Sequence, residues 1–291
     1  MGAFYDEPGS EKILSHAHLF TSMQEYLLKG FYDIDLEMTE RAAKKWNAEA
    51  FADLETALEG TDIAVVAVPD RFHMEYMRKL AGYDLKLILL EKPVATCLAE
   101  AQEMNSIFEK KKVPVAVNYS RQYVPEFNHI AAEIKDNLYG GFVAGSGYYG
   151  KGLLHSGSHM IAMLLVLLGR PLEVCKQSEI VDYTADDPSI SALLKFSGGG
   201  EFYLHHVSAE KYTVFEMDLL FERKRIRITE LGGRILVSSP EEDPVFPGYK
   251  TLRGETESET GLYRSLEHLG ENLIDFLSGR GELNCTLEWI F

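Results

Sequence analysis

Aliphatic runs and helical stretches alternate along the first 120 residues. The aliphatic runs suit buried strands, and three stand out: Thr61–Pro69, Leu85–Leu90 and Val113–Val117. Stretches typical of helices separate them: His16–Tyr26, Leu36–Trp46, Asp53–Leu58, Met74–Leu80 and Leu98–Lys110. A shorter strand is expected at Leu27–Tyr32. Strands that alternate with helices at this spacing form βαβ units and a parallel sheet, so residues 1–121 are predicted to be a doubly wound, Rossmann-like domain.

The pattern changes after residue 121. A helix is expected at Tyr123–Asn137 and a strand at Phe142–Tyr149, followed by an apolar helix that ends at Gly169. Strand-like runs then follow one another without long helices between them: Leu172–Val181, Ile190–Phe196, Glu201–Val207, Val214–Phe221, Arg225–Thr229 and Arg234–Val237. Consecutive strands of this kind form antiparallel sheets. Residues 122–291 are therefore predicted to be an α+β domain with a largely antiparallel sheet.

The end of this second domain is expected to differ from its middle. Residues 239–261 are rich in Pro, Glu, Gly and Thr and are predicted to be an exposed loop, after which Tyr263–Leu277 forms a closing amphipathic helix. Leu283–Phe291 is short and apolar, as if a further helix were cut off there. In the strand Glu201–Val207, apolar and aromatic residues occupy both faces, which favours burial on both sides. Pairing of two such sheets predicts a homodimer or tetramer.

Two charged residues close the most apolar strand. Leu85–Leu90 stops at Glu91-Lys92-Pro93, because proline cannot continue a strand ladder. Lys92 therefore lies at the carboxyl end of a central parallel strand, where ligands bind in open α/β sheets. A lysine in that place can act as an acid, a base or an anchor for a hydroxyl group. The alternative is a solvated lysine at an ordinary strand end.

An acidic pair closes the predicted strand Leu27–Tyr32. In a dinucleotide-binding fold, an acidic residue at the end of the second strand accepts hydrogen bonds from the adenosine ribose, and Asp33 occupies that place. The alternative is that Asp33 or Asp35 only caps the helix Leu36–Trp46. We expect one of the two to cap the helix and the other to contact ribose.

The glycine-rich loop of such a domain is missing from the start of the chain. A dinucleotide-binding domain opens with a strand that runs into G-x-G-x-x-G, but Gly2 and Gly9 are the only glycines before Gly30. No apolar strand precedes them. The first strand normally lies in the middle of the sheet, so its absence would leave two neighbouring strands without a partner.

Several of these motifs together resemble the Gfo/Idh/MocA family of NAD(P)-dependent oxidoreductases. The motifs are Val65–Pro69 with His73, Glu91-Lys92-Pro93, Asn118-Tyr119 with Arg121, and Gly152–His159. The resemblance implies that Lys92 lies beside the nicotinamide and the substrate hydroxyl, and Asp33 at the ribose. It also implies a set of cofactor-binding residues: Asp33, Val68, Pro69, His73, Glu91 and Asn118. By this alignment Gly2 falls near the last glycine of the family's loop, as if the first strand were lost.

Two histidines four residues apart extend this resemblance. Family members commonly have an aspartate where His155 stands and a histidine where His159 stands, and the pair works with the lysine as a proton relay. A further family aspartate is replaced by Ala162. A histidine at 155 can still transfer protons near neutral pH. Zinc binding by His-x-x-x-His and simple helix capping are the alternatives, but the zincin motif needs Glu where this chain has Ser156, so no metal is expected.

The composition of the chain limits the classes of molecule that it is expected to bind. With 29 basic against 45 acidic residues, the formal charge is −16, which argues against nucleic acids and anionic membranes. Three distant cysteines suggest reduced thiols. No run approaches the ~20 apolar residues of a membrane span and no signal peptide is evident, which predicts a cytoplasmic protein.

These features together predict an enzyme that transfers a hydride between a nicotinamide cofactor and a secondary alcohol carbon of a sugar or cyclitol. The catalytic residues would be Lys92, His159 and His155. NAD is the expected cofactor, because Asp33 would repel the 2′-phosphate of NADP, although NADP stays possible. The alternative is a non-catalytic, oligomeric relative that has lost cofactor binding together with the glycine-rich loop.

Overall fold

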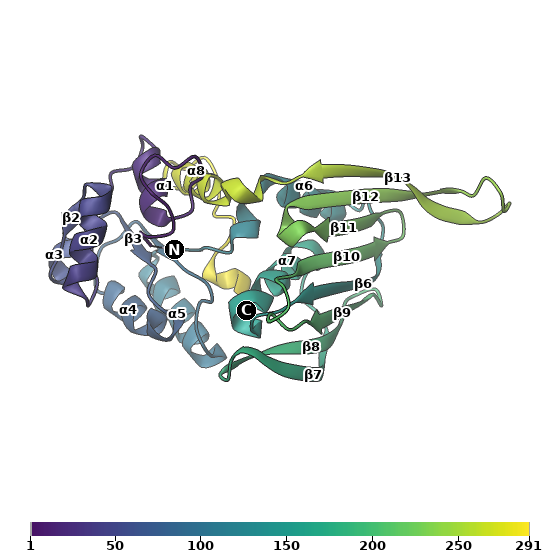
Figure 1. Ribbon diagram of the computed structural model, residues 1–291, viewed down its shortest axis with the longest axis horizontal. Helices are drawn as coiled ribbons and strands as arrows, with labels where there is room; N and C mark the ends of the chain where they lie inside the picture. The colour runs from purple at the N-terminus through teal and green to yellow at the C-terminus, as the bar shows by residue number, and fades with distance from the viewer. Residues whose placement is uncertain (1, 291) are drawn as a thin grey trace. The chain divides into compact units, whose positions relative to one another are not determined.

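Two units with separate cores make up the computed structural model, which describes residues 2–290 (Figure 1). Unit 1 comprises residues 2–123 and 263–290, and unit 2 comprises residues 124–262. The first boundary lies two residues from the predicted one. The sequence placed residues 263–291 in the second domain, whereas the structure groups this last segment with unit 1.

A parallel sheet in the order β3-β4-β5 forms the centre of unit 1. All four residues of β4 are inaccessible to solvent, which explains its continuous aliphatic sequence. The predicted Rossmann-like, parallel arrangement is thus confirmed. The elements of this part are α1 (His16–Ser22), β1 (Gly30–Phe31), α2 (Leu36–Trp46), β2 (Glu49–Ala50), α3 (Leu54–Leu58), β3 (Ile63–Val66), α4 (His73–Leu80), β4 (Leu87–Leu90), α5 (Leu98–Lys111) and β5 (Val115–Val117).

The strands β1 and β2 form a second, two-stranded parallel sheet. Within residues 2–290 this pair is not hydrogen-bonded to β3, and the strand expected at Leu27–Tyr32 is reduced to two residues. A strand of two residues has few ladder hydrogen bonds, so α2, which packs Ala42 and Trp46 into a small core, contributes to holding it. The absence of a first family strand stays a prediction.

The helix α8 (Ser265–Leu277) explains why the end of the chain belongs to unit 1. Its apolar face buries Leu266, Leu269 and Leu273. The hydroxyl of Tyr26 donates a hydrogen bond to the carbonyl of Gly270 at 2.7 Å. Further on, the amide of Val117 in β5 donates to the carbonyl of Cys285 at 3.0 Å, so the last segment extends the central sheet.

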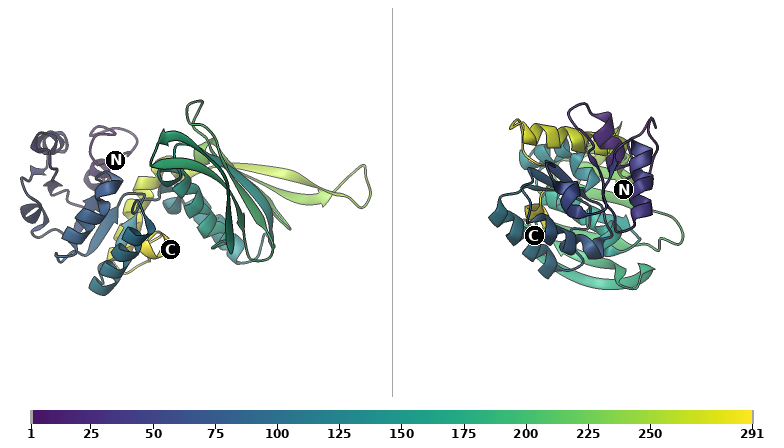
Figure 2. Two further views of the ribbon diagram at one scale, coloured as in Figure 1. Left: turned by 90° about the horizontal axis from the view of Figure 1, so that it is seen from below. Right: turned by 90° about the vertical axis from the view of Figure 1, so that its left-hand side faces the viewer.

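An eight-stranded mixed sheet in the order β13-β12-β11-β10-β6-β9-β8-β7 forms unit 2. All neighbouring strands are antiparallel except β6 and β9, which confirms the predicted α+β class. Two helices, α6 (Pro125–Lys135) and α7 (Ser158–Leu168), cover one face of the sheet (Figure 2). The strands are β6 (Phe142–Tyr149), β7 (Glu173–Thr184), β8 (Asp187–Lys195), β9 (Glu201–His206), β10 (Phe215–Phe221), β11 (Arg225–Thr229), β12 (Arg234–Glu242) and β13 (Lys250–Glu259).

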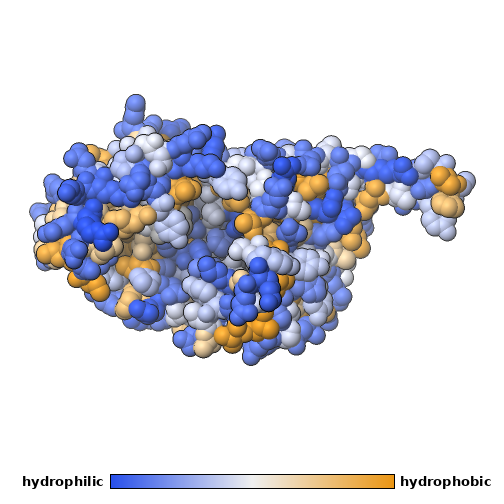
Figure 3. All heavy atoms as spheres, viewed as in Figure 1, coloured by the Kyte–Doolittle hydropathy of each residue, from blue (hydrophilic) through white to orange (hydrophobic). Residues whose placement is uncertain are grey.

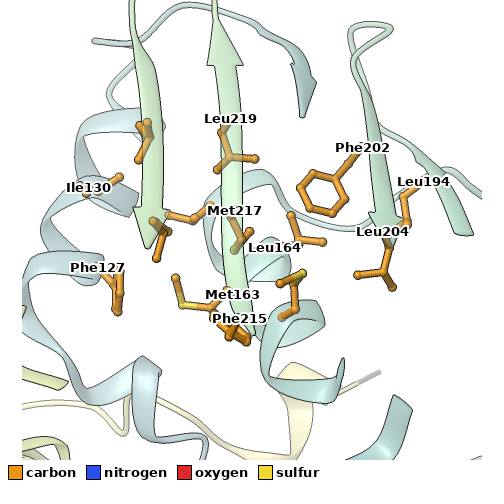
Figure 4. Close-up of a cluster of buried hydrophobic side chains, with 14 of the residues drawn as sticks. Phe127, Ile130, Met163, Leu164, Leu194, Phe202, Leu204, Phe215, Met217 and Leu219 are labelled. Carbon is orange, nitrogen blue, oxygen red and sulfur yellow. The ribbon is translucent and has the colours of Figure 1, made fainter. Parts of the chain in front are cut away.

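The helix-covered face of this sheet carries the core of unit 2. Alternate residues of β9 and β10 point into it and meet residues of both helices (Figure 4). On β9, Phe202 and Leu204 are buried, whereas Tyr203 and His205 on the opposite face are only half-buried. Within the chain the two helices cover one face only, and burial of the second face between subunits stays a prediction.

The long hairpin β12–β13 occupies most of the segment predicted to be a loop. That prediction is wrong, because β12 runs to Glu242 and β13 pairs with it from Lys250 (Figure 1). Both faces of this hairpin carry polar residues, including an ion pair between Arg234 and Glu257, so no apolar alternation marks it. Its tip is apolar, with Val245 and Phe246 well exposed (Figure 3).

Candidate active site

A buried polar cluster lies where two strands of the central sheet end. Glu91 directly follows β4, Asn118 directly follows β5, and His16 is the first residue of α1. The His16 Nε2 donates to Glu91 Oε1 at 2.7 Å, and Asn118 Nδ2 donates to the same oxygen at 2.8 Å. We refer to His16, Glu91 and Asn118 as the Glu91 cluster.

The charge of Glu91 is held by its neighbours. Burial alone would raise the pKa of this carboxyl group, but the hydrogen bond and the charge of His16, followed by the hydrogen bond from Asn118, lower its pKa to about 2. Glu91 is therefore a buried anion at neutral pH. A buried anion without such donors would be strongly destabilising, so the three residues act as one unit.

Two atoms of the Glu91 cluster have no hydrogen-bond partner within residues 2–290. These atoms are His16 Nδ1 and Asn118 Oδ1, although their side chains are only 3% and 2% exposed. Buried polar atoms are almost always paired, so such atoms at the ligand-binding edge of a parallel sheet indicate a polar ligand. The cluster fits a nicotinamide dinucleotide, which carries hydrogen-bonding groups on its ring and ribose.

Lys92 follows Glu91 and lies at the carboxyl end of the central strand, as the sequence predicts. It is half-buried, and the peptide bond between Lys92 and Pro93 is cis. The amide of Glu91 donates to the carbonyl of Val66 in β3 at 3.0 Å, which fixes the backbone just before the lysine. The backbone that carries Lys92 is thus tied to β3.

His73 connects the ends of two neighbouring strands. Its Nδ1 lies 2.8 Å from the carbonyl oxygen of Pro93 and its Nε2 lies 3.0 Å from that of Val68. Both ring nitrogens thus face backbone carbonyls, and the side chain is 1% exposed. The loops that carry Val68, Pro69 and Lys92 are tied together by this ring. Cofactor binding by His73, Val68 and Pro69 stays a prediction, and the geometry favours positioning as the part played by His73.

The two aspartates after β1, Asp33 and Asp35, differ in their contacts. Asp35 is the N-cap of α2 and accepts hydrogen bonds from the amides of Glu37 and Met38, so capping is confirmed for Asp35. Asp33 is exposed, and one of its oxygens accepts the amide of Asp35 at 2.9 Å. Ribose binding by Asp33 stays a prediction.

The two predicted catalytic histidines belong to unit 2. His155 lies in a π-helical turn, Leu153–Gly157, and His159 lies in the first turn of α7. The ring of His155 packs against that of Tyr183, with 4.6 Å between the ring centroids. Both histidines are half-buried.

Asp187 positions the turn that carries His155, a contact that no sequence motif indicated. Its two carboxylate oxygens accept the amides of Leu154 and His155 at 2.8 and 2.9 Å. Gly152 starts the turn with a φ of +80°, and any Cβ there would overlap the Asp187 carboxylate. Asp187 is the first residue of β8. A contact across more than thirty residues leaves no local signal that could have revealed it.

A G-x-G-x-x-G spacing does occur at 145–150, in β6 of unit 2. Its first two glycines lie inside the strand, where a Cβ would come within 2.9 Å of the Phe202 ring at Gly145 and within 2.8 Å at Gly147. These glycines are small for packing, so the spacing is no phosphate loop. Across residues 2–290, no three His, Cys, Asp or Glu side chains gather in a way that could hold a metal ion, and no helix there is long and apolar enough to cross a membrane.

The arrangement of unit 1 by itself defines a class of protein. A parallel sheet with helices between its strands carries the charged and polar residues at its carboxyl edge, which is the architecture of Rossmann-type nucleotide-binding proteins. Residues 9–119 match the model of the oxidoreductase family with an NAD-binding Rossmann fold, GFO_IDH_MocA. Over these residues the chain is similar to this family, as its motifs suggested.

Individual relatives agree with this similarity. Glucose-6-phosphate 3-dehydrogenase of Bacillus subtilis is 25% identical over 130 residues, which are 45% of this chain but only 37% of that protein's length. Among solved structures, levoglucosan dehydrogenase in complex with NADH and levoglucosan superposes with a TM-score of 0.79, at 13% identity over 94% of this chain and 89% of the other. A dehydrogenase from Chromobacterium violaceum gives a TM-score of 0.77, at 17% identity over 94% and 85%. These structural likenesses show the fold.

Proposed function

We propose that this chain is an NAD-dependent dehydrogenase that oxidises a secondary alcohol of a sugar or cyclitol. The observation that carries the proposal is the Glu91 cluster, with two buried unpaired atoms, directly beside Lys92 at the carboxyl edge of the sheet. The NAD-binding family adds support, as do the relatives named for glucose 6-phosphate and levoglucosan.

In this proposal each residue has a part in holding the reactants or moving a proton. Bound NAD would supply the acceptor for the hydride that leaves the alcohol carbon. Lys92 would hold the hydroxyl group and take its proton as the carbonyl forms. His159, with His155, would carry the proton onward. Asp33 would accept hydrogen bonds from the adenosine ribose, which favours NAD over NADP because the aspartate repels a 2′-phosphate.

The test compares the protein with its Lys92→Met variant. Absorbance of NADH follows turnover against a panel of sugars, sugar phosphates and cyclitols, and calorimetry measures NAD(H) binding separately. Methionine keeps the length of the side chain without the amine, so we expect turnover to fall at least about a hundredfold, the lower range for loss of a proton-transfer group. Binding of NADH should stay nearly unchanged. A variant with unchanged kcat would refute the catalytic role.

The non-catalytic alternative predicts a different result in the same experiment. A relative that lost cofactor binding would show no heat with NAD(H) or NADP(H), and neither dinucleotide would raise its melting temperature. We also expect one oligomer, a homodimer or a tetramer, and a small-molecule substrate.

A further inference from the structure

His16 is a residue that neither the sequence motifs nor the similarity to the family singled out. It sits at the start of α1, 75 residues before Glu91, and yet donates to the carboxylate of Glu91 at 2.7 Å. Ser15, the N-cap of α1, fixes this end of the helix by accepting the amide of His18. The backbone of His16 and its ring Nε2 are thus both held in place. The position of its Nδ1 is therefore defined.

The unpaired atoms of the cluster have a specific chemistry. Asn118 Nδ2 donates to Glu91, so the remaining Oδ1 of Asn118 is an acceptor that requires an N–H or O–H donor. His16 Nδ1 presents a lone pair when the ring is neutral and a hydrogen when it is protonated. A primary carboxamide carries an NH₂ donor and a carbonyl acceptor side by side, so it satisfies Asn118 and pairs with His16 in either protonation state.

We propose that His16 and Asn118, both anchored on Glu91, bind the carboxamide group of the nicotinamide ring. His16 is then a specificity-determining residue for the cofactor, and Glu91 is a positioning residue that holds the two together. This rests on the proposed function, since it requires that the chain binds NAD(H). The competing ligand group is the nicotinamide ribose diol, whose hydroxyl groups can also donate and accept.

The experiment uses binding, measured by calorimetry and NADH fluorescence, rather than turnover. In the His16→Gln variant, the glutamine amide can replace Nε2 as donor to Glu91, but nothing replaces Nδ1. We expect the Kd for NADH to rise roughly tenfold, the effect of one lost hydrogen bond. The Kd for ADP-ribose, which lacks the nicotinamide ring, should not change.

The neighbouring His18 supplies the matched control. It is also buried in α1, but its Nδ1 bonds Asp6 at 2.8 Å, away from the Glu91 cluster. An asparagine amide can replace Nδ1, so His18→Asn is expected to bind NADH like the unaltered protein. If both variants weaken the binding of NADH to the same degree, His16 acts only through the packing of α1 and the proposal is wrong.

Two cofactor analogues test the proposal without any substitution. The 3-acetylpyridine dinucleotide keeps the carbonyl group but lacks the NH₂, and should bind several-fold more weakly than NAD. The thionicotinamide dinucleotide keeps the NH₂ but has a poorer acceptor, so the protein should bind it more weakly than NAD. This difference in affinity should be smaller in the His16→Gln variant. Equal affinity for NAD and both analogues would overturn the assignment in favour of the ribose diol. Absence of any NAD(H) binding would instead overturn the proposed function, and this inference with it.

Discussion

The buried carboxylate of Glu91 makes the stability of unit 1 depend on pH in a predictable way. Its pKa is lowered from 4.5 to about 2 in the folded protein, by His16 first and then by Asn118. A depressed pKa means that the charged form stabilises the fold, so this contribution is complete above the unfolded pKa and is lost as the pH falls from about 5 toward 2. A difference of roughly 2.5 units corresponds to about 3 kcal/mol.

The perturbation that isolates this effect is Glu91→Gln, which keeps the shape of the side chain and cannot ionise. At pH 7 the free energy of unfolding should be larger for the unaltered protein than for the variant. This difference should decrease by about 3 kcal/mol between pH 7 and pH 2. Urea unfolding followed by tryptophan fluorescence is the suitable assay, because Trp46 is buried in the small core of unit 1.

An exposed glutamate of the same unit provides the comparison. Glu40 lies on the solvent side of α2, and Glu40→Gln should follow the pH profile of the unaltered protein. A difference between the protein and Glu91→Gln that stays constant from pH 7 to pH 3 would refute the reasoning, because the charge of Glu91 would then add nothing to stability.

Two further predictions concern unit 2. Gly152→Ala should destabilise the protein by about 3 kcal/mol in thermal unfolding, because Gly152 combines a positive φ with a close contact to Asp187. Gly169 has a similar φ and no atom nearby, so Gly169→Ala should destabilise the protein less. Equal losses of stability in the two variants would contradict the role of Asp187. Light scattering at micromolar concentration should show a dimer or tetramer that Tyr203→Glu, on the sheet face without helices, shifts toward monomer; a monomeric protein would contradict the predicted assembly.

The sequence predicted those features whose causes are local. The helix Leu36–Trp46 has the predicted bounds because an aspartate caps its start and its apolar residues repeat on one face. Lys92 could be placed at the carboxyl end of a central strand because a proline and two charges follow an unbroken aliphatic run. Both signals lie within a dozen residues of what they determine.

The features that the sequence missed depend on distant partners. His16 is recognised as a site residue only through its contact with Glu91, and no spacing rule links a helix start to a strand end so far along the chain. The hairpin β12–β13 was taken for a loop because both its faces are polar, and its pairing is supported by ion pairs such as Arg234 with Glu257. Alternation of apolar residues reveals a strand only where one face is buried.

The way unit 1 is assembled from two separated segments has a consequence for its synthesis. Helix α8 covers Leu19 of α1 and accepts the hydrogen bond of Tyr26, yet it leaves the ribosome only after all of unit 2. At ordinary translation rates that interval is on the order of ten seconds. During it, unit 2 can complete its own core, while the apolar surface of unit 1 that awaits α8 stays uncovered. The nascent chain is therefore most open to aggregation, and to capture by a chaperone, before its last thirty residues emerge.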